Sequence, residues 1–318
     1  MRTLVTGSAG FIGSNLTDRL LQEGNFVRGF DNLSTGRIEF LEKALRSEAF
    51  EFCKGDLLDA EQLRTVVAGV DIVFHLAANA DVRNGPEHPR KDLEQNTTGT
   101  ANVLEAMRDC GVKRIVFSST GSVYGESDVI PTPEDAPFPV QTSLYGASKL
   151  AAEAMIAAYC EAFGMQSWIF RFVSILGERY THGHVFDFYK QLIKHPESLS
   201  VLGNGRQRKS YLYVQDCLDA VLLALTKAED KVNIFNLGTD EFCAVDDSIQ
   251  WISACLNVNP ERIYSGGERG WIGDNPFIFL DCSRIRSLGW LPRFSIQAAV
   301  ERTVEYLRKN QWVLEYRQ

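Results

Sequence analysis

The sequence predicts an α/β fold in which a doubly wound parallel sheet is joined to a smaller C-terminal lobe. Short apolar runs alternate with helical patterns through the first half of the chain, and a glycine-rich turn separates the first run from the first helix. Such alternation implies right-handed crossovers and a parallel sheet covered by helices on both faces. We therefore expect an architecture of the Rossmann type.

The expected elements follow in a regular order. Strands are expected at 3–6, 25–30, 50–54, 70–76 and 114–118, and helices at 11–23, 96–110 and 145–163. From Phe172 onward the pattern loosens, and two strands at 211–214 and 232–237 are expected to return to the sheet. We predict a domain of residues 1–172 plus 212–240 and a lobe of residues 173–211 plus 241–318.

Composition excludes several classes of protein. A net charge of −8 over 318 residues argues against nucleic acid and anionic membranes as partners, so a phosphate-bearing ligand would need a locally positive pocket. The seven cysteines are widely spaced without a Cys-x-x-Cys pair, and the histidines are scattered, so neither disulfides nor a metal site is expected. With no signal-peptide core and no membrane-length apolar run, we expect a cytoplasmic protein.

Three glycines mark a candidate dinucleotide site. Gly7, Gly10 and Gly13 lie directly after the first expected strand and open the first helix. Where side chains are absent, a pyrophosphate can approach the free N–H groups and the positive end of the helix dipole. The position between first strand and first helix is what makes this pattern informative.

Asp31 ends the second expected strand. A carboxylate there can accept hydrogen bonds from the adenosine ribose and would repel a 2′-phosphate, which favours NAD over NADP. The alternative is a solvated turn acid, and the nearby Arg28 and Arg37 keep NADP open. Asp56 and Leu57, after the third strand, are candidates to flank the adenine.

A second group of residues indicates acid–base chemistry. Tyr145 and Lys149 are four residues apart, so their side chains share one helix face, and we expect the ammonium to lower the pKa of the tyrosine. Ser118 and Thr120 come at the carboxyl end of the 114–118 strand, where open α/β sheets place their ligands. A surface pair and a polar loop are the alternatives if these residues are taken singly.

These motifs occur together in an order and spacing that resemble a known family. They include Gly7-x-x-Gly10-x-x-Gly13, His75-Leu76-Ala77-Ala78, Asn96, Ser118-Ser119-Thr120, Tyr124-Gly125, Tyr145-x-x-x-Lys149, Gly203-Asn204-Gly205, Lys209 to Asp216, Gly273-Asp274 and Leu288-Gly289-Trp290. Over essentially its whole length the chain resembles the extended short-chain dehydrogenase/reductases, and most closely the UDP-glucose (UDP-galactose) 4-epimerases.

The resemblance implies NAD as cofactor and a set of residues that bind it. These are Gly7, Gly10, Phe11, Ile12, Gly13, Asp31, Asn32, Ser34, Gly36, Asp56, Leu57, Leu76, Ala77, Ala78, Asn96, Ser118, Tyr145, Lys149 and Phe172. It also implies that Tyr145, Thr120 and Lys149 are catalytic. In the family the tyrosinate removes the proton of the sugar C4 hydroxyl, the threonine relays it, and the lysine holds the tyrosine and the nicotinamide ribose.

The residues after Thr120 separate the branches of this family. The family's 4,6-dehydratases carry an Asp-Glu pair directly after the threonine, and the related decarboxylases usually have a glutamate where this chain has Ser122. Gly121 and Ser122 cannot transfer protons for an elimination. The resemblance therefore implies a 4-epimerase that passes through a 4-keto sugar.

The smaller lobe is expected to bind a nucleotide-sugar, for which the family implies a UDP-hexose. Candidate substrate-binding residues are Thr120, Ser122, Ser174, Lys209, Tyr211, Arg269 and Asp274. Arg206 and Arg208 are expected to add positive charge to the diphosphate pocket. Trp271 and Ser174 depart from the family pattern, and Ile278 is intermediate in size. The identity of the sugar therefore stays open between glucose/galactose, an N-acetylhexosamine, a hexuronate and a pentose. The nucleotide could also be dTDP, and the pathway could be galactose metabolism or glycan-precursor supply.

The helix after Lys149 is apolar nearly all round, which indicates that more than one face is covered. The family resemblance implies a homodimer in which this helix and the 96–110 helix form the interface. Two other functions stay open: a keto-sugar reductase that uses NAD(P)H, and a non-catalytic NAD-binding regulator.

Overall fold

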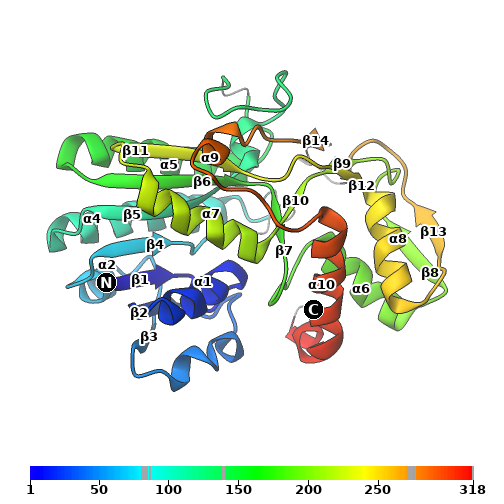
Figure 1. Ribbon diagram of the computed structural model, residues 1–318, viewed down its shortest axis with the longest axis horizontal. Coiled ribbons are helices and arrows are strands. Elements are labelled where there is room, and N and C mark those ends of the chain that lie inside the picture. The colour runs from blue at the N-terminus through cyan, green and yellow to red at the C-terminus, as the bar shows by residue number, and fades with distance from the viewer. Residues whose placement is uncertain (80–84, 86, 138–139, 271–274, 276, 317–318) are drawn as a thin grey trace.

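The protein is described from a computed structural model that covers residues 1–79, 85, 87–137, 140–270, 275 and 277–316. Figure 1 shows the N-terminal half built around one large sheet, with a smaller lobe of helices and short strands beside it. The division into two sequence-discontinuous parts stays a prediction.

The large sheet has seven parallel strands, which confirms the α/β class. Its order is β11-β6-β5-β4-β1-β2-β3, so sequence order reverses between β1 and β4. The strands are β1 Arg2–Thr6, β2 Phe26–Asp31, β3 Phe50–Lys54, β4 Ile72–His75, β5 Arg114–Thr120, β6 Gln166–Phe172 and β11 Val232–Leu237. In open α/β sheets such a reversal opens a crevice at the carboxyl ends of the strands.

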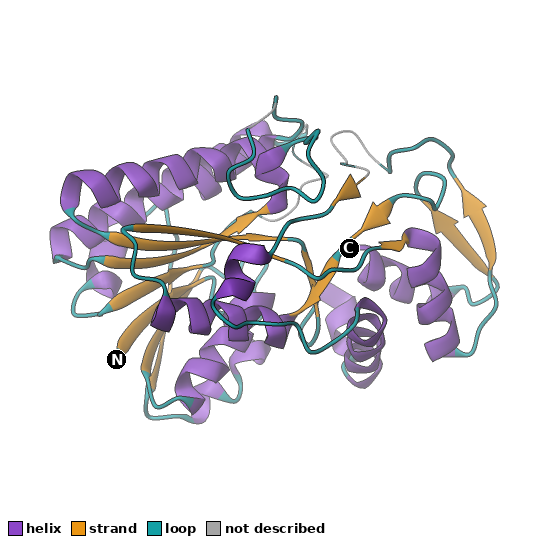
Figure 2. Ribbon diagram, turned by 45° about the horizontal axis from the view of Figure 1, so that its top comes forward, coloured by secondary structure: helices purple, strands orange, loops and turns teal. Residues whose placement is uncertain are grey.

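Helices cover both faces of this sheet, as Figure 2 shows. One face carries α1 Phe11–Gln22 and α7 Val214–Lys227, and the other α2 Ala60–Val67, α4 Gly99–Cys110 and α5 Leu144–Phe163. Successive strand residues point to opposite faces, so Leu4 and Val5 of β1 belong to two separate hydrophobic cores. Burial on both faces explains the nearly continuous apolar runs of the sequence.

The smaller lobe contains longer helices and short paired strands. It holds α6 His184–Lys194, α8 Val245–Leu256 and α10 Ile296–Lys309, whereas the short helix α9 Ser283–Ser287 packs against β11 of the large sheet. Its strands are β8 Ser198–Val201 with β13 Glu261–Tyr264, and β9 Arg208–Lys209 between β12 Cys243–Ala244 and β14 Phe277–Ile278. The remaining short elements are η1 Ile38–Leu41, η2 Ala44–Arg46, α3 Pro89–Asp92, η3 Leu93–Thr98, η4 Gly121–Tyr124 and η5 Gln311–Tyr316.

One expected strand lies elsewhere than predicted. Residues 211–213 form β10 (Tyr211–Tyr213), which pairs in parallel with β7 (Ser174–Leu176) in a sheet of its own and does not join the large sheet. The place beside β6 is taken by β11, which pairs along nearly the whole of β6. The expected return of 232–237 to the large sheet is therefore confirmed, and that of 211–214 was wrong.

Two boundaries near the crevice also differ from expectation. The helix expected at 96–110 divides into a π-helical segment, η3, and then α4, which ends at Gly111 in the left-handed conformation. Strand β5 continues to Thr120, two residues beyond the expected end. Within the described residues, no helix is long and apolar enough to cross a bilayer, and no group of three or more His, Cys, Asp or Glu side chains is placed to hold a metal ion.

Candidate active site

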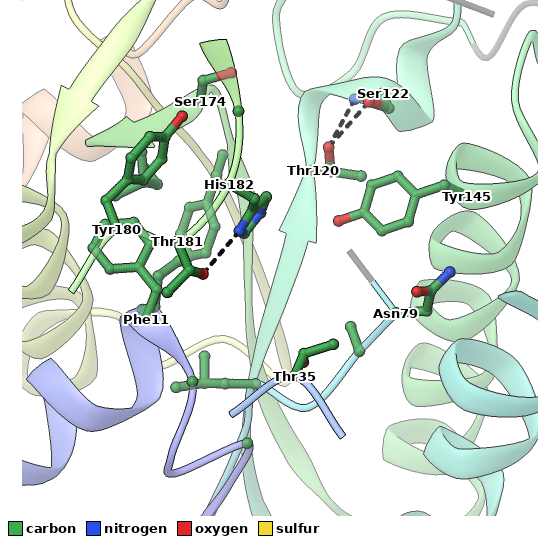
Figure 3. Close-up of a pocket in the computed structure, with 18 of the residues that line it drawn as sticks. Phe11, Thr35, Asn79, Thr120, Ser122, Tyr145, Ser174, Tyr180, Thr181 and His182 are labelled. Atoms are coloured by element: carbon green, nitrogen blue, oxygen red, sulfur yellow. Dashed lines mark hydrogen bonds between the residues drawn. The ribbon is translucent and has the colours of Figure 1, made fainter. Parts of the chain in front are cut away.

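A cavity of about 930 Å³ lies where the large sheet meets the smaller lobe. Its walls come from the β1–α1 turn, the ends of β2, β4 and β5, the start of α5, and the β7–α6 and β9–β10 segments of the lobe. Figure 3 shows side chains from both parts facing this space, with Thr120 and Tyr145 on one side and Tyr180 and His182 on the other. The cavity is large and partly apolar, as sites for sizeable ligands are.

The β1–α1 turn is built so that side chains cannot intrude. Gly7 has φ +71°, and a Cβ on it would lie 2.7 Å from the Ala77 nitrogen. A Cβ on Gly13 would lie 2.0 Å from the Gly7 carbonyl oxygen. The first turn of α1 contains no acidic residue. The turn thus leaves backbone N–H groups and the positive helix end open to an anion, which fits the pyrophosphate of a dinucleotide.

Asp31 holds the neighbouring turn together. Its carboxylate is buried and accepts hydrogen bonds from the backbone N–H groups of Ala9, at 3.0 Å, and Leu33, at 2.8 Å. Burial raises the pKa of Asp31, and the two backbone donors oppose that rise. Asp56 acts indirectly, since it accepts a 2.9 Å hydrogen bond from the Asn32 side chain and does not line the cavity.

The strand end and the helix start bring Thr120 and Tyr145 together. Ser143 caps α5 by accepting a hydrogen bond from the Gly146 N–H, which sets the first turn of the helix that carries Tyr145. The Thr120 hydroxyl donates to Ser122 Oγ at 3.2 Å and accepts from the Ser122 N–H at 3.1 Å. In Figure 3 the ring of Tyr145 extends from α5 toward the strand end that bears Thr120.

The ionisation of Tyr145 differs from the expectation. Burial raises the pKa of Tyr145 to about 12, the nearby Asp92 adds to the rise, and a hydrogen bond with Thr120 opposes it. Burial also lowers the pKa of Lys149 to about 7, while Glu153 opposes that change. Lys149 lies 1% exposed with its Nζ 4.0 Å from the centre of the Phe117 ring. The expected lowering of the tyrosine pKa was wrong for these side chains alone, because desolvation and the charge of Asp92 raise it and only the Thr120 hydrogen bond opposes the rise.

Asn96 is buried next to the site and connects two of its elements by hydrogen bonds. Its Oδ1 accepts from the Asn79 N–H at 2.7 Å and its Nδ2 donates to Ser148 Oγ at 2.9 Å, so it connects the end of β4 to α5. The Thr100 hydroxyl donates to the Asn96 carbonyl. The Thr100 oxygen is therefore the acceptor in its 3.0 Å hydrogen bond with His75 Nε2. π-Helical turns such as η3 are frequent at functional sites.

The lobe side of the cavity contains a hydrogen-bonded histidine that the sequence did not indicate. His184 begins α6, and its Nδ1 lies 3.0 Å from the Tyr211 hydroxyl while its Nε2 lies 2.7 Å from Ser248 Oγ. Burial, with a smaller effect of Lys209, lowers the pKa of His184 to about 3, so the ring is neutral. Lys209 donates to the Asn275 carbonyl at 2.6 Å. The isolated His182 and His184 gave no metal-like pattern, and only the fold places His184 beside Tyr211.

Most of the predicted site residues do line one cavity. They are Gly7, Gly10, Phe11, Ile12, Gly13, Asp31, Asn32, Ser34, Gly36, Leu57, Leu76, Ala77, Ala78, Thr120, Ser122, Tyr145, Phe172, Ser174, Lys209 and Tyr211. Tyr180, Thr181 and Gln191 also line it, although no sequence motif marked them.

Several predicted residues lie outside the cavity wall. Ser118 hydrogen-bonds the His75 carbonyl, and Arg269 pairs with Glu126 at 2.7 Å on the surface. Arg208 does not add charge to the pocket, because its guanidinium lies over the ring of Phe277 on the opposite side of β9 from Lys209. The Arg206 side chain is exposed, and it too is absent from the cavity wall. Trp271 and Asp274 lie outside the described residues.

Comparison with known proteins agrees with this geometry. The family model of the NAD dependent epimerase/dehydratase family matches residues 3–238. The chain belongs to the NAD dependent epimerase/dehydratase family. Its cofactor is therefore NAD, and the roles of the glycine turn and of Asp31 in binding it stay predictions.

Relatives in this family act on different nucleotide-sugars. A UDP-glucose 4-epimerase of Mycolicibacterium smegmatis is 34% identical, over 98% of this chain and 99% of its own. The UDP-glucose 4-epimerase of Thermotoga maritima, solved with UDP-glucose, has a TM-score of 0.88 at 32% identity, with 98% and 100% covered. A UDP-glucuronic acid 4-epimerase of Bacillus cereus, solved with UDP-glucuronic acid and NAD, has a TM-score of 0.90 at 26% identity, with 97% and 99% covered.

Proposed function

We propose that this protein is an NAD-dependent nucleotide-sugar 4-epimerase that interconverts UDP-glucose and UDP-galactose or a related UDP-sugar pair. The observation that carries the proposal is the environment of the strand end beside Tyr145. There Gly121 and Ser122, directly after Thr120, stand where an elimination would need acidic side chains, and Ser122 is hydrogen-bonded to Thr120.

The space at Gly121 supports this interpretation. A Cβ on Gly121 would lie 3.0 Å from Ile278 Cγ2 and 3.4 Å from Leu280 Cδ1, so a side chain there fits only if the Ile278 side chain shifts by a few tenths of an ångström. Without an acid at this position, loss of water from the sugar lacks the proton donor that it would need next to Thr120. Epimerisation at a single carbinol carbon needs only a base for one hydroxyl and a reversible hydride acceptor.

The chain supplies the base and its orientation. Tyr145 is the group that takes the hydroxyl proton, Thr120 orients that hydroxyl, and Lys149 lies on the same helix face one turn on. NAD, when bound, accepts the hydride and returns it within the same cycle. Burial raises the pKa of Tyr145 to about 12 and lowers that of Lys149 to about 7, so Tyr145 is protonated in these surroundings and must lose its proton before it acts as a base.

The lobe supports a diphosphate-linked substrate. Lys209 and Tyr211 line the cavity from β9 and β10, and His184 and Asp187 of the first turn of α6 line the same space. UDP is favoured by the relatives solved with UDP-sugars. Substrate binding by Arg269 and Asp274, and an effect of Trp271 on the choice of substrate, stay predictions.

The test is conversion of a panel of UDP-hexoses without added reductant. Purified protein is incubated with each sugar, and anion-exchange chromatography is used to detect the C4 epimer while absorbance follows NADH. An equilibrium mixture without net NADH supports the epimerase. In a separate assay with added NADH and a keto-sugar, stoichiometric NADH use would favour the reductase. Tyr145→Phe should abolish conversion, and Tyr264→Phe, at an exposed tyrosine of β13, is the matched control.

We also propose a homodimer formed through α4 and α5. The buried side of α5 includes Ala152, Ile156 and Cys160, yet its other side exposes further apolar residues, among them Ala151, Ala154 and Ala158. An apolar face on a helix of a globular protein is normally covered.

A further inference from the structure

A buried carboxylate lies on the catalytic helix one turn beyond Lys149. Glu153 follows Lys149 by four residues and Tyr145 by eight, so the three share one face of α5. Its side chain is 5% exposed. One carboxylate oxygen accepts a hydrogen bond from Ser119, the residue that precedes Thr120 on β5. Glu153 thus connects the helix that bears the base to the strand end that bears the threonine.

Arg171 of β6 holds this carboxylate in a fork. Its Nε lies 3.1 Å and 3.2 Å from the two oxygens of Glu153, and its Nη2 donates to Oε2 at 2.7 Å. The guanidinium is 2% exposed. Paired donors of this kind fix direction as well as distance, which a lysine ammonium would not do.

The same guanidinium reaches a third element. Arg171 Nη1 donates to the Tyr124 hydroxyl at 2.7 Å and to the Glu134 carbonyl at 2.9 Å. Tyr124 ends η4, the turn that carries Ser122, and its hydroxyl donates to Asn236 Oδ1 at 2.8 Å. One buried side chain therefore joins α5, the end of β5 and the η4 turn, which are the three elements around the reacting hydroxyls.

A buried ion pair is not explained by stability alone. Desolvating both charges costs free energy that their attraction only partly offsets, and apolar replacements of such pairs are often equally stable. At this site, however, the charge has a second partner in Lys149. Among the described residues, Glu153 of α5 favours the charged form of Lys149, and Lys149 in turn acts on His75 of β4. Tyr145 lies one turn before Lys149 on α5, and the charge of Asp92 acts on Tyr145. Burial and Lys149 lower the pKa of His75 to about 3, so that ring is neutral.

We propose that Glu153, locked by Arg171, is a positioning residue that favours the charged form of Lys149 and keeps the Ser119–Thr120 strand end aligned with Tyr145. The inference rests on the proposed function, because it concerns the base of that reaction. When the tyrosine–lysine pair has lost one proton, the pair is either tyrosinate with ammonium or phenol with neutral amine. The negative charge of Glu153 favours the first form, in which Tyr145 can accept the proton of a substrate hydroxyl.

The test compares Glu153→Gln with Glu153→Asp in the NAD-bound protein. Glutamine keeps the shape and removes the charge, whereas aspartate keeps the charge on a shorter side chain. Tyr145 is titrated by its tyrosinate absorbance, taken as the difference between each protein and the same protein carrying Tyr145→Phe. We expect Glu153→Gln to raise the tyrosinate midpoint by about one pH unit and Glu153→Asp to leave it near the wild-type value. The kcat of Glu153→Gln should fall about tenfold or more with little change in KM.

Asp216→Asn is the matched control, since Asp216 is also a buried carboxylate paired with an arginine, Arg293, but lies away from Tyr145. It should lower thermal stability without moving the tyrosinate midpoint. The proposal is overturned if Glu153→Gln and Glu153→Asp shift the midpoint equally, or if neither shifts it. Should Glu153→Gln not fold, Arg171→Lys and Glu153→Asp decide: an unchanged kcat in both contradicts the positioning role, and a kcat loss at constant KM supports it.

The absorbance titration does not depend on turnover. If the wild-type protein converts no UDP-hexose, the proposed epimerase fails, and the tyrosinate midpoints still decide whether Glu153 controls the pair.

Discussion

Replacement of Gly13 by alanine should separate the two demands made on the β1–α1 turn, which are conformation and space. Gly13 lies in α1 and has no positive φ, so alanine meets no backbone penalty there. Its Cβ, however, would stand 2.0 Å from the Gly7 carbonyl oxygen and 2.8 Å from the Gly7 carbonyl carbon. Those atoms are backbone, so the overlap can be relieved only if the turn moves.

The free-energy cost of Gly13→Ala can be compared with that of Gly24→Ala, where the backbone conformation is unfavourable for alanine but the space is free. Overpacking typically costs about 1–3 kcal/mol, and contact with rigid backbone places Gly13→Ala at about 3 kcal/mol or more. Gly24 has φ +79°, and a Cβ there would meet nothing within 4 Å, so Gly24→Ala should cost only about 1 kcal/mol through conformation. Displacement of the turn should weaken NAD binding by about tenfold or more, which corresponds to about 1.4 kcal/mol.

The assay measures thermal unfolding and NAD affinity of both variants under the same conditions. Gly13→Ala should lose both stability and NAD binding, whereas Gly24→Ala should lose a little stability and bind NAD as the wild type does. Equal NAD affinity in Gly13→Ala and wild type would refute the idea that the glycine exists for close approach. A loss of affinity in Gly24→Ala would show that general destabilisation, and not the turn, governs binding.

Three further predictions concern the lysine, the ribose-side acid and the dimer. The pKa of Lys149 is about 7 in the folded protein, against an ordinary value of 10.5. Between pH 7 and pH 10.5 the unfolded chain therefore binds a proton at Lys149 that the folded chain does not, so the free energy of unfolding rises with pH across this window. Lys149→Met should therefore be more stable than the wild type at pH 7 by about 1–3 kcal/mol, and this gain should shrink toward pH 10. The variant should have no turnover. Calorimetry at several pH values checks this, and the absence of a stability gain at pH 7 would contradict it. Asp31→Asn should weaken NAD binding about tenfold in a fluorescence titration without creating NADP affinity, because its side chain also holds the Ala9 and Leu33 N–H groups; tight NADP binding would count against that role. Ala154→Arg, on the exposed side of α5, should give a monomer by light scattering, and an unchanged oligomer would place the interface elsewhere.

Sequence reasoning succeeded where a local pattern has one structural solution. The Gly7-Gly10-Gly13 spacing predicted a tight turn before the first helix in which side chains are excluded, and the Tyr145–Lys149 spacing placed both residues on one helix face. It failed where two distant segments compete for one position. Residues 211–213 have a strand-like composition, but β11 occupies the edge beside β6, and pairing at that edge is decided by the whole chain.

The direction of charged side chains and the pKa values of buried groups were harder to predict than the positions of the motifs. Arg208 and Lys209 are adjacent in sequence, yet strand alternation sends Arg208 onto Phe277 and Lys209 toward the cavity. The pKa of Tyr145 could not be read from a neighbouring lysine, since burial depends on every element that packs over the side chain.

The sequence by itself determined the α/β class, the dinucleotide turn, the family and the residues Thr120, Tyr145 and Lys149, because each depends on short-range spacing or on periodicity. Only the tertiary structure decided that Glu153, Arg171, Ser119 and Tyr124 form one buried network behind those residues. They come from four segments between residues 119 and 171, and the hydrogen bonds among them could not be read from any local spacing. Their contacts exist because packing removes water from all four side chains at once, and an unpaired charge in that space would be costly.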